Sequence, residues 1–588
     1  MIKKLMKSIR EYKTPSILTG FFVTLEVIID CILPLLMAKL IDEVYGNWLS
    51  QVFKLGIILI ACAFVSLLFG TLSGKFCAKA SCGFAKNLRK DLYYKIQTFS
   101  FANIDKFSSA SLVTRLTTDV WYVQDAYMML IRIAIRSPLM FIFSLVMGFN
   151  INVKMGFIFL CVVPLLIAGM LLIIKKATTL FSKVFKKYDN LNNSIQENVR
   201  AMRVVKSFVR EDYEKEKFKN SCDDVYGDFI KAEKVVSKSS PLMMFCVYLM
   251  NILISVIGAV IIVKTFGGVG ADGTYMWGEL STGDLASLIT YSTQILSSLM
   301  MLSMVLVTIT ISSESAKRIV EVLDEEPDIK SPENPIMEVK DGSIEFKNVS
   351  FKYSANAEKQ ALKGVNLKIN SGETVGILGG TGSSKTTLVN LISRLYDATT
   401  GEVKVGKVNV KDYDLEVLRN QVAVVLQKNV LFSGTIKDNL RWGDENASDE
   451  EIERVCKLAQ ADEFVKSFPN GYDTIIDQGG TNVSGGQKQR LCIARALLKK
   501  PKVLILDDST SAVDTKTDAK IRKAFKEELP DTTKIIIAQR ISSIEDADKI
   551  LVMEGGEIVA MGTHEELLKT SPIYLDVYTS QNNKGGKK

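Results

Sequence analysis

Two short stretches of the sequence combine residue types that suit the binding of phosphate and of a metal ion. Residues 484–487, Ser-Gly-Gly-Gln, form a turn of small residues that opens a predicted helix, and the first turn of a helix presents free N–H groups to an anion. Residues 503–506 are a short apolar run, typical of a buried parallel strand, and Asp507 and Asp508 follow it directly. Because ligands bind at the carboxyl edge of open α/β sheets, we expect both carboxylates to lie at a binding site.

A glycine-rich loop with a lysine precedes these stretches in the chain. The predicted strand 374–378 leads into residues 379–387, Gly-Gly-Thr-Gly-Ser-Ser-Lys-Thr-Thr. Backbone amides in such a loop bind the β- and γ-phosphates of a nucleotide, the lysine adds a point charge, and the next threonine offers a hydroxyl to Mg²⁺. Such a loop alone is weak evidence of function. Together, the loop, the Ser-Gly-Gly-Gln turn and the strand that ends in aspartate are strong evidence.

In this order, the three motifs resemble those of the ATP-binding cassette (ABC) superfamily, whose signature sequence is SGGQ. The resemblance covers nearly the whole chain, to about Tyr578, and is to half-transporters of bacterial heterodimeric multidrug-type ABC exporters. It implies a multidomain fold, in which six transmembrane helices with long cytoplasmic extensions precede an α/β P-loop nucleotide-binding domain. It also implies ATP and Mg²⁺ as ligands.

The resemblance assigns roles to individual residues. Tyr353 matches the aromatic residue that stacks on adenine, and Gln427 matches the Q-loop glutamine, which reaches Mg²⁺ and contacts a coupling helix. Asp507 matches the aspartate that holds Mg²⁺ through water, together with Thr386 and Gln427, and Asp514 matches the D-loop aspartate at a dimer interface. The expected ATP-binding residues are Tyr353, Gly379, Gly380, Thr381, Gly382, Ser383, Ser384, Lys385, Thr386, Thr387 and Gln427. The residues expected to serve an ATP bound by a partner chain are Ser484, Gly485, Gly486 and Gln487.

Three positions on the phosphate side depart from the family pattern. Ser384 replaces the glycine before the lysine, and its Cβ restricts both the backbone and the approach of phosphate. Asp508 replaces the glutamate that polarises the attacking water; it is one methylene shorter, and a misplacement of about 1 Å can cost on the order of a hundredfold in rate. Gln539 occupies the place of the switch histidine, and glutamine is uncharged at every pH. The chain has 1 histidine, His564, in a stretch that matches the family's C-terminal segment and not its switch.

Apolar residues gather in the first half of the chain. Hydrophobic residues make up 47% of the 588 residues, and long runs of them precede the glycine-rich loop. Each run is near the ~20 residues that cross a bilayer. The predicted spans are about 15–40, 54–72, 131–149, 155–174, 241–263 and 285–311. The predicted domains are a transmembrane domain over 1–313, a linker over 314–336, a nucleotide-binding domain over 337–580 and a disordered tail over 581–588.

Basic residues predict the orientation of the spans. Residues 1–13 and the long segments 75–130 and 175–240 are rich in Lys and Arg, whereas the remaining connections are shorter and poor in them. The positive-inside rule therefore places the N-terminus in the cytoplasm of a multi-pass cell-membrane protein. By resemblance, residues 101–120 and 193–211 contain coupling helices. The net charge of +8 is mild and is expected to face anionic lipid, not nucleic acid. The scattered cysteines are expected to be reduced thiols.

Several polar residues fall within the predicted spans. Glu26 and Asp30 are four residues apart and share a helix face, and carboxylates at membrane depth usually face a cavity or a partner. They form either a substrate-cavity site for a cation or a proton, together with Arg136, or an ordinary wet vestibule or ion pair with Arg132 or Arg136. The sixth predicted span also contains Met300, Met301 and Met304. These methionines either form an adaptable surface for substrate or pack against neighbouring helices in the ordinary way.

A weakened phosphate side beside an intact signature predicts half of a heterodimer. The chain would lend its signature to a second ABC half-transporter, and the pair would export hydrophobic or amphipathic substrates by alternating access between discrete states. Three alternatives remain open at this point: a homodimeric exporter with Asp508 as a slow base, a non-transporting ATP-gated regulator, and a lipid or peptide translocator.

Overall fold

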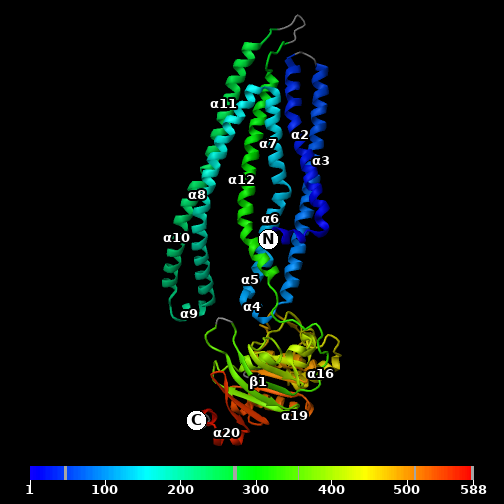
Figure 1. Ribbon diagram of the computed structural model, residues 1–588, viewed down its shortest axis with the longest axis vertical. Helices are drawn as coiled ribbons and strands as arrows, with labels where there is room; N and C mark the ends of the chain where they lie inside the picture. The colour runs from blue at the N-terminus through cyan, green and yellow to red at the C-terminus, as the bar shows by residue number, and fades with distance from the viewer. Residues whose placement is uncertain (46–48, 269–274, 355–356, 509–511, 584–588) are drawn as a thin grey trace. The chain divides into compact units, whose positions relative to one another are not determined.

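A computed structural model of the protein describes residues 1–45, 49–268, 275–354, 357–508 and 512–583 (Figure 1). The chain divides into two compact units. The first, which is helical, combines Met1–Gln97 with Ser109–Glu325, and the second, an α/β unit, combines Thr98–Ser108 with Glu326–Lys588.

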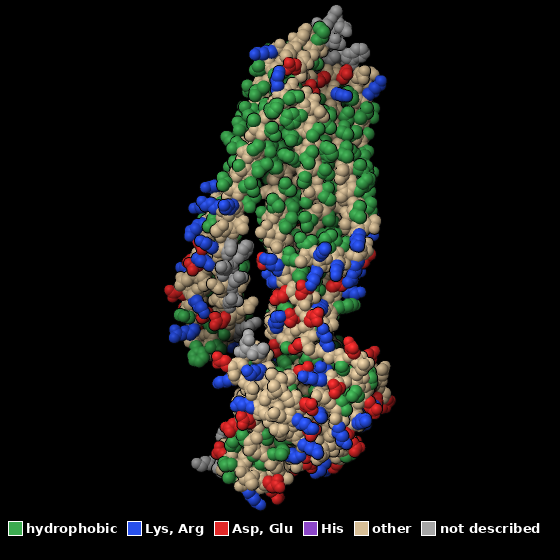
Figure 2. All heavy atoms as spheres, in the orientation of Figure 1, with side chains coloured by type: hydrophobic (Ala, Val, Ile, Leu, Met, Phe, Trp, Pro, Cys, Tyr) green, Lys and Arg blue, Asp and Glu red, His purple; other side chains and the backbone are tan. Residues whose placement is uncertain are grey.

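The helical unit contains 6 candidate membrane spans within the described residues, as the sequence predicted. Its outer surface carries a broad band of hydrophobic side chains, with charged side chains beyond the band (Figure 2). Helices suit this environment because they satisfy every backbone hydrogen bond internally. The helices of this unit are α1 Ile2–Lys7, η1 Arg10–Tyr12, α2 Lys13–Tyr45, α3 Leu49–Gln97, α5 Ser109–Thr114, η2 Arg115–Asp119, α6 Val120–Ile131, α7 Ile133–Ile151, α8 Val153–Arg200, α9 Met202–Ser207, α10 Glu211–Val236, α11 Ser239–Thr265 and α12 Thr282–Asp324.

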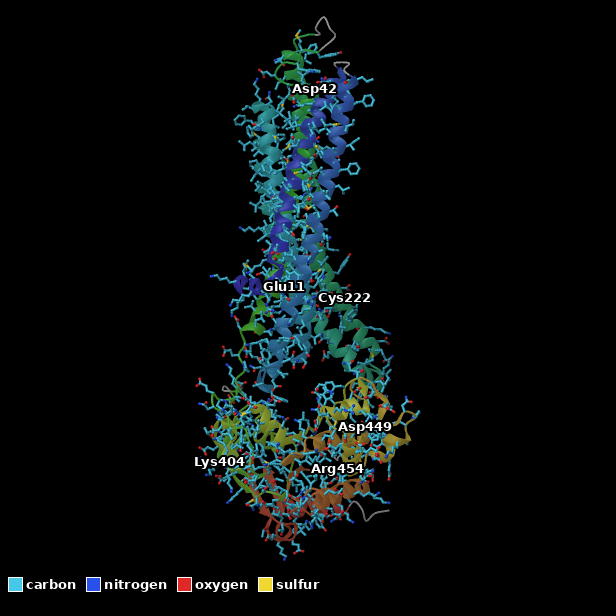
Figure 3. All side chains as sticks on the ribbon, turned by 90° about the vertical axis from the view of Figure 1, so that its right-hand side faces the viewer. Glu11, Asp42, Cys222, Lys404, Asp449 and Arg454 are labelled. Carbon is cyan, nitrogen blue, oxygen red and sulfur yellow. The ribbon has the colours of Figure 1, made fainter. Side chains whose placement is uncertain are left out.

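Close packing fixes the start of α12 against α2. A Cβ on Gly283 would lie 2.1 Å from the carbonyl oxygen of Ala38, so only glycine allows this approach. Asp42 accepts a hydrogen bond from the backbone N–H of Gly283 at 2.9 Å. Figure 3 shows Asp42 at this end of the helical unit and Glu11 near the other end of α2. Further along α12, Tyr291 is fully buried in the core that α8, α11 and α12 share.

Several helices continue beyond the apolar runs that predicted them. α12 extends to Asp324, whereas the sequence predicted a linker over 314–336. The polar extension is held by Arg318, whose Nε donates to the Asp119 carboxylate at 2.8 Å. Asp119, only 1% exposed, belongs to η2, a π-helical turn. A hydropathy pattern cannot reveal such an extension, because charged residues stabilise it.

The α/β unit is built on two sheets. A 4-stranded antiparallel sheet has the order β2-β1-β4-β5, and a 6-stranded sheet has the order β12-β11-β3-β10-β9-β6. β3, β6, β9, β10 and β11 run parallel, and every residue of β9 and β10 is buried, as expected for strands covered on both faces.

The longer strands are β1 Ile344–Phe351, β2 Leu362–Ile369, β3 Thr374–Gly379, β4 Thr400–Val405, β6 Val422–Val425, β9 Val503–Asp507, β10 Thr533–Ile537, β11 Lys549–Glu554 and β12 Glu557–Gly562. The shorter strands are β5 Val408–Asn409, β7 Gly434–Thr435 and β8 Ile475–Ile476. The helices are α4 Phe101–Phe107, α13 Lys385–Ile392, η3 Val410–Asp412, α14 Leu415–Gln421, α15 Ile436–Arg441, α16 Asp449–Leu458, α17 Asp462–Ser467, η4 Gly471–Asp473, α18 Gly485–Leu498, α19 Thr515–Glu528, η5 Ile541–Ser543, α20 His564–Thr570 and α21 Pro572–Asn583.

α4, within the predicted coupling segment 101–120, belongs to the α/β unit. Ser100 and Asn103 close a capping box at its start. Asn103 donates to the carbonyl of Glu326 at 3.3 Å, and Asp105 accepts from the hydroxyl of Tyr396 at 2.8 Å. The hydrogen bonds join this short helix directly to the nucleotide-binding fold.

Candidate nucleotide-binding site

The glycine-rich loop connects β3 to α13, as predicted. The ammonium of Lys385 lies inside the loop and donates to the carbonyls of Gly379 at 2.8 Å and Gly380 at 2.9 Å. It also lies 3.2 Å from the hydroxyl of Ser383. Burial lowers the pKa of Lys385, and the nearby charges of Asp507 and Asp508 oppose this effect. A lysine held in this way is positioned to meet phosphate oxygens that enter the loop.

A hydroxyl and a carboxylate, which the sequence predicted as Mg²⁺ ligands, meet at the end of β9. The hydroxyl of Thr386 donates to the carboxylate of Asp507 at 2.8 Å. Asp507 is only 2% exposed, and burial raises its pKa. A hydroxyl and a carboxylate suit a hard cation, so these residues fit the ion that the family uses.

Ser384 occupies a backbone conformation that favours glycine. Its φ of 70° and ψ of 25° are left-handed, and its side chain does not cap α13. A Cβ in this region costs about 1–2 kcal/mol. The loop therefore keeps the backbone geometry that suits a glycine while carrying a serine. The substitution raises the conformational energy of the loop and leaves its shape unchanged.

We predict that Ser384→Gly tightens ATP binding by about three- to tenfold, because phosphate can approach a loop without the Cβ. The free energy of unfolding should change by less than about 1 kcal/mol, since glycine's greater flexibility offsets the relieved strain. Titration with a fluorescent ATP analogue and chemical denaturation measure the two effects. Lys407→Gly is the control, because Lys407 also has a positive φ of 67° and lies outside the loop. Unchanged affinity in Ser384→Gly would contradict the prediction.

Asp508, Gln539 and Gln427 lie together beside the loop. The amide of Gln539 donates to the Asp508 carboxylate at 2.8 Å. Burial raises the pKa of Asp508, whereas the bond from Gln539 and the nearby Gln427 side chain lower it. The carboxylate that occupies the position of the base is thus engaged by a neutral amide. A general base must instead lie within about 3 Å of its water.

The backbone beside Gln539 is supported by a residue that the sequence placed in the tail. Gln581 lies in α21, donates to the carbonyl of Gln539 at 2.8 Å and accepts from the N–H of Ile541 at 2.9 Å. The predicted tail over 581–588 therefore begins inside a helix, which continues to Asn583. The rest of that tail, 584–588, lies outside the described residues. Nothing in the motif pattern marks Gln581, because it acts on backbone atoms.

Tyr353 contacts the end of the glycine-rich loop at Thr387. Its hydroxyl is 2.8 Å from that of Thr387, and its side chain is 53% exposed. Its ring meets Tyr396 edge-on, with 5.3 Å between centroids, and Tyr396 in turn bonds to Asp105 of α4. Sequence reasoning missed Tyr396, which joins the predicted adenine-stacking residue to the predicted coupling helix.

The signature begins α18 and packs against the D-loop. Ser484 and Gln487 form a reciprocal capping box at the start of this helix. A Cβ on Gly486 would lie 2.9 Å from the carbonyl oxygen of Ala512, so glycine allows the close approach. Asp514 caps α19 by accepting from the N–H of Thr517 at 3.0 Å.

The phosphate side and the signature side form separate groups within this chain. Among the described residues, no hydrogen bond connects 379–387 with 484–487. His564, which the sequence assigned to the C-terminal segment, bonds through Nδ1 to the hydroxyl of Tyr574 at 2.7 Å. The hydrogen bonds of the two groups are therefore separate within the described residues, and their role as two half-sites stays a prediction.

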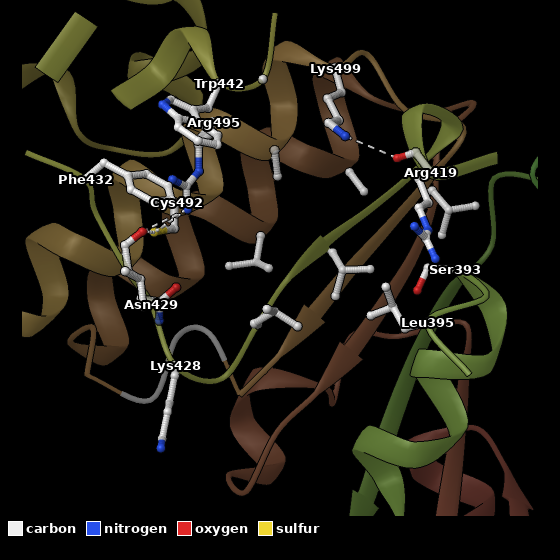
Figure 4. A pocket seen from close by; sticks show the side chains of 18 of the residues that line it. Ser393, Leu395, Arg419, Lys428, Asn429, Phe432, Trp442, Cys492, Arg495 and Lys499 are labelled. Carbon is white, nitrogen blue, oxygen red and sulfur yellow. Dashed lines mark hydrogen bonds between the residues drawn. The ribbon is translucent and has the colours of Figure 1, made fainter. Parts of the chain in front are cut away.

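A cavity of about 450 Å³ lies beside the residues that follow Gln427 (Figure 4). Phe432 and Trp442 stack on its wall with 4.1 Å between centroids, and Arg495 donates to the carbonyl of Val430 at 3.1 Å. Phe101 of α4 also lines it. An apolar wall with basic residues around it suits an apolar peptide segment.

The predicted membrane residues also come together. Arg136 of α7 bonds to Glu26 and, at 2.9 Å, to Asp30, both on α2. The sequence left Arg132 and Arg136 as candidate partners of the two carboxylates, and in the structure Arg136 pairs with both. Their role in a substrate cavity stays a prediction.

Comparisons with known proteins cover both units. The family described as ABC transporter transmembrane region matches residues 16–300, and the family described as ABC transporter matches residues 362–511. The uncharacterized ABC transporter ATP-binding protein YfiB of Bacillus subtilis is 38% identical over 586 residues, with 99% of each chain covered. The ATP-dependent lipid A-core flippase of Desulfotalea psychrophila is 31% identical, also with 99% of each chain covered. A bacterial Atm1-family ABC exporter solved with ATP bound has a TM-score of 0.80 at 24% identity, covering 97% of this chain and 98% of its own.

Proposed function

Because the chain belongs to the ABC transporter family and has the fold of its exporters, we propose that it is one subunit of a heterodimeric, ATP-driven exporter of the cell membrane. Its own phosphate side forms a degenerate site that binds ATP and hydrolyses it slowly or not at all. Its signature completes the catalytic site of a second ABC half-transporter. The N-terminus and the nucleotide-binding domain face the cytoplasm.

One observation carries this proposal: the Asp508 carboxylate accepts a hydrogen bond from the amide of Gln539, which occupies the place of the switch histidine. General-base catalysis is worth about 10²–10⁴-fold and needs a group that can take a proton from water. The Gln539 amide can neither take a proton nor change its charge, so it cannot assist Asp508 as a histidine would. The intact capping box at Ser484 supports the complementary half of the proposal, a signature kept for the partner's ATP.

The residues of this chain have defined tasks in that scheme. The loop 379–387 binds the phosphates of its own ATP, and Thr386 with Asp507 holds Mg²⁺, which neutralises charge on the phosphates. The N–H groups at the start of α18 donate to the γ-phosphate of the partner's ATP, because a helix N-terminus favours an anion. ATP thus joins two nucleotide-binding domains, and its turnover at the partner's site separates them.

Coupling helices transmit this closure to the membrane helices. α4 is bonded to the nucleotide-binding fold through Asp105 and Asn103. α9, in the predicted segment 193–211, precedes the apolar side chains of Phe208 and Val209, which are 73% and 81% exposed. The spans then alternate between inward- and outward-facing states.

The substrates are proposed to be hydrophobic or amphipathic. Exposed methionines on α12 provide a flexible, polarisable surface: Met300, Met301 and Met304 are 43%, 43% and 54% exposed. A relative that is 31% identical is an ATP-dependent lipid A-core flippase, which supports amphipathic substrates.

ATPase activity of the purified chain in lipid tests the proposal. We expect almost no turnover from the chain alone and robust turnover when it is combined with the correct ABC half-transporter of the same organism. The partner is then identified by which combination is active. Robust turnover of the single chain would instead establish a homodimer, and ATP binding without substrate-stimulated turnover in every combination would indicate a regulator.

A further inference from the structure

A second cavity in the α/β unit contains a buried lysine that the nucleotide-binding site does not use. The cavity holds about 220 Å³ and is lined by residues of α19, β10 and the segment around η5. Lys534 of β10 lines it and is only 4% exposed. Within the described part of the chain, its ammonium makes no hydrogen bond and no ion pair. Because a buried lysine is almost always paired, this one points to a ligand that enters the cavity.

The alternation of side chains along β10 directs Lys534 to this cavity. Successive side chains of a strand point to opposite faces, so Lys534 and Ile536 share a face, and both line the cavity. Ile535 and Ile537 belong to the core on the other face. Gln539 follows the carboxyl end of β10, five residues and roughly 17 Å of extended chain from Lys534. The cavity is therefore at the opposite end of β10 from the nucleotide-binding site.

The charged residues of the lining are mostly basic. They are Arg522, Lys523 and Lys526 of α19 and Lys534, and Asp546 is the one acidic residue in the described lining. Asp546 pairs with Arg522 at 2.8 Å. This pair neutralises the arginine and leaves the lysines to attract an anion.

Acidic residues outside the lining do not pair with Lys534. Asp548 accepts a hydrogen bond from the backbone N–H of Thr374 at 2.8 Å. Burial lowers the pKa of Lys534, and the charges of Asp548 and Asp531 oppose this effect. An anion in direct contact with the ammonium would offset the cost of its burial, which these more distant acids do not.

We propose that this cavity binds a small phosphate-bearing anion through Lys534 and Lys526. A lysine ammonium is a compact charge with three donors and a common ligand of phosphate. The cavity is smaller than the roughly 300–1,000 Å³ of pockets that bind drug-sized ligands. It therefore suits inorganic phosphate or the phosphate end of a small monoester.

A ligand in this cavity would stabilise the segment that carries Gln539. Ile536 precedes this segment, Ser543 and Ile544 follow it, and all three line the cavity. The anion would thus act on both flanks of the segment without contacting ATP. This inference goes beyond the proposed function, because the site is complete within one chain and is the same in a heterodimer or a homodimer.

Binding of radiolabelled inorganic phosphate, measured by equilibrium dialysis, tests the site. The full-length chain is held in nanodiscs of a zwitterionic lipid, and binding to empty nanodiscs is subtracted. Mg²⁺ and a non-hydrolysable ATP analogue fill the phosphate loop, so that the label reports on other sites. We expect saturable binding of about one phosphate per chain. Neither a partner nor hydrolysis is needed, so the result is independent of whether the ATPase proposal holds.

Competition distinguishes the two sources of phosphate. Unlabelled glycerol 3-phosphate is compared with unlabelled inorganic phosphate as a competitor of the label. Displacement at a lower concentration of glycerol 3-phosphate would support the site with a phosphate monoester as its ligand. Displacement at an equal or higher concentration would support the site with free phosphate as its ligand.

Two substitutions locate the site. Lys534→Met removes the buried charge but keeps an unbranched side chain, and it should weaken phosphate binding by about tenfold or more, because a buried charge is poorly screened. Lys526→Gln should weaken binding by about threefold, as expected for an exposed charge. Lys526 is chosen over Lys523, which already lies 3.8 Å from Glu527. Lys520→Gln, at an exposed position of α19 outside the lining, is the matched control and should bind as the wild type does.

Thermal unfolding separates loss of the site from loss of the fold. Without phosphate, Lys534→Met should unfold at or above the wild-type temperature, because it removes a buried ammonium without a partner. Added phosphate should raise the unfolding temperature of the wild type and of Lys520→Gln more than that of Lys534→Met. Absence of saturable phosphate binding, or wild-type affinity in Lys534→Met, would overturn the proposal. If Lys534→Met fails to fold, equal affinities of Lys526→Gln and Lys520→Gln would overturn it.

Discussion

ATP turnover by the heterodimer should fall to background when Ser484 is replaced by arginine, although no described hydrogen bond joins Ser484 to the phosphate loop of its own chain. The serine caps α18 through a bond from Gln487 N–H, and arginine removes that cap. Its long side chain also fills the turn that the partner's γ-phosphate must approach. Loss of one group that stabilises transition-state charge costs about 10²–10³-fold, and this change disturbs several such groups.

Ser448→Arg provides the matched control for Ser484→Arg. Ser448 also caps a helix of the α/β unit, α16, by accepting from Glu451 N–H at 3.2 Å. Its loss should cost about 1 kcal/mol of stability and leave turnover unchanged. Steady-state ATPase of the purified pair measures both variants. Full turnover in Ser484→Arg would refute the assignment of the signature to the partner's ATP.

Restoring hydrolysis at this chain's own site should require two substitutions. Asp508→Glu alone should raise turnover little, because Gln539 remains bonded to the carboxylate and cannot carry charge. Asp508→Glu with Gln539→His should raise it by about a hundredfold, since a positioned base is worth about 10²–10⁴-fold. The activity is measured in a pair whose partner has lost its own catalytic glutamate, so that the turnover comes from this chain's site.

Adding Asp507→Asn to the double variant provides the control. Asp507 holds the hydroxyl of Thr386 at the expected Mg²⁺ position, so its neutralisation should abolish the regained activity. Ordinary turnover by Asp508→Glu alone would show that the length of the carboxylate, and not Gln539, limits the site. No gain from the double variant would place the defect elsewhere in the loop.

The sequence predicted those features that local pattern determines. The buried strand before Asp507 and the helix that begins after Ser484 are where they were expected, because a continuous apolar run and a cap are local signals. The loop pattern marked Ser384 as a departure from glycine, but the left-handed backbone that it keeps was found only in the structure. The motifs placed Asp508 and Gln539 at the positions of the base and the switch, and the structure adds the hydrogen bond that joins them.

Other features depend on contacts between residues far apart in sequence. Gln581 supports the Gln539 loop through backbone atoms, which impose no residue pattern on their partner. Tyr396 connects Tyr353 to α4 through ring packing that no motif records. The choice of Arg136 over Arg132 as the partner of Glu26 depends on how α2 and α7 are rotated, and helix rotation follows from packing with several neighbours.

The most direct test of the degenerate site asks which chain holds the nucleotide that is being hydrolysed. The assembled pair is incubated with photoreactive 8-azido-ATP and vanadate, which traps the product of hydrolysis, and is then irradiated and digested for peptide mapping. We predict that trapped label appears on the partner's phosphate loop and that labelling of residues near 379–387 in this chain does not depend on vanadate. Vanadate-dependent label on this chain's loop, equal to that on the partner's, would contradict the account.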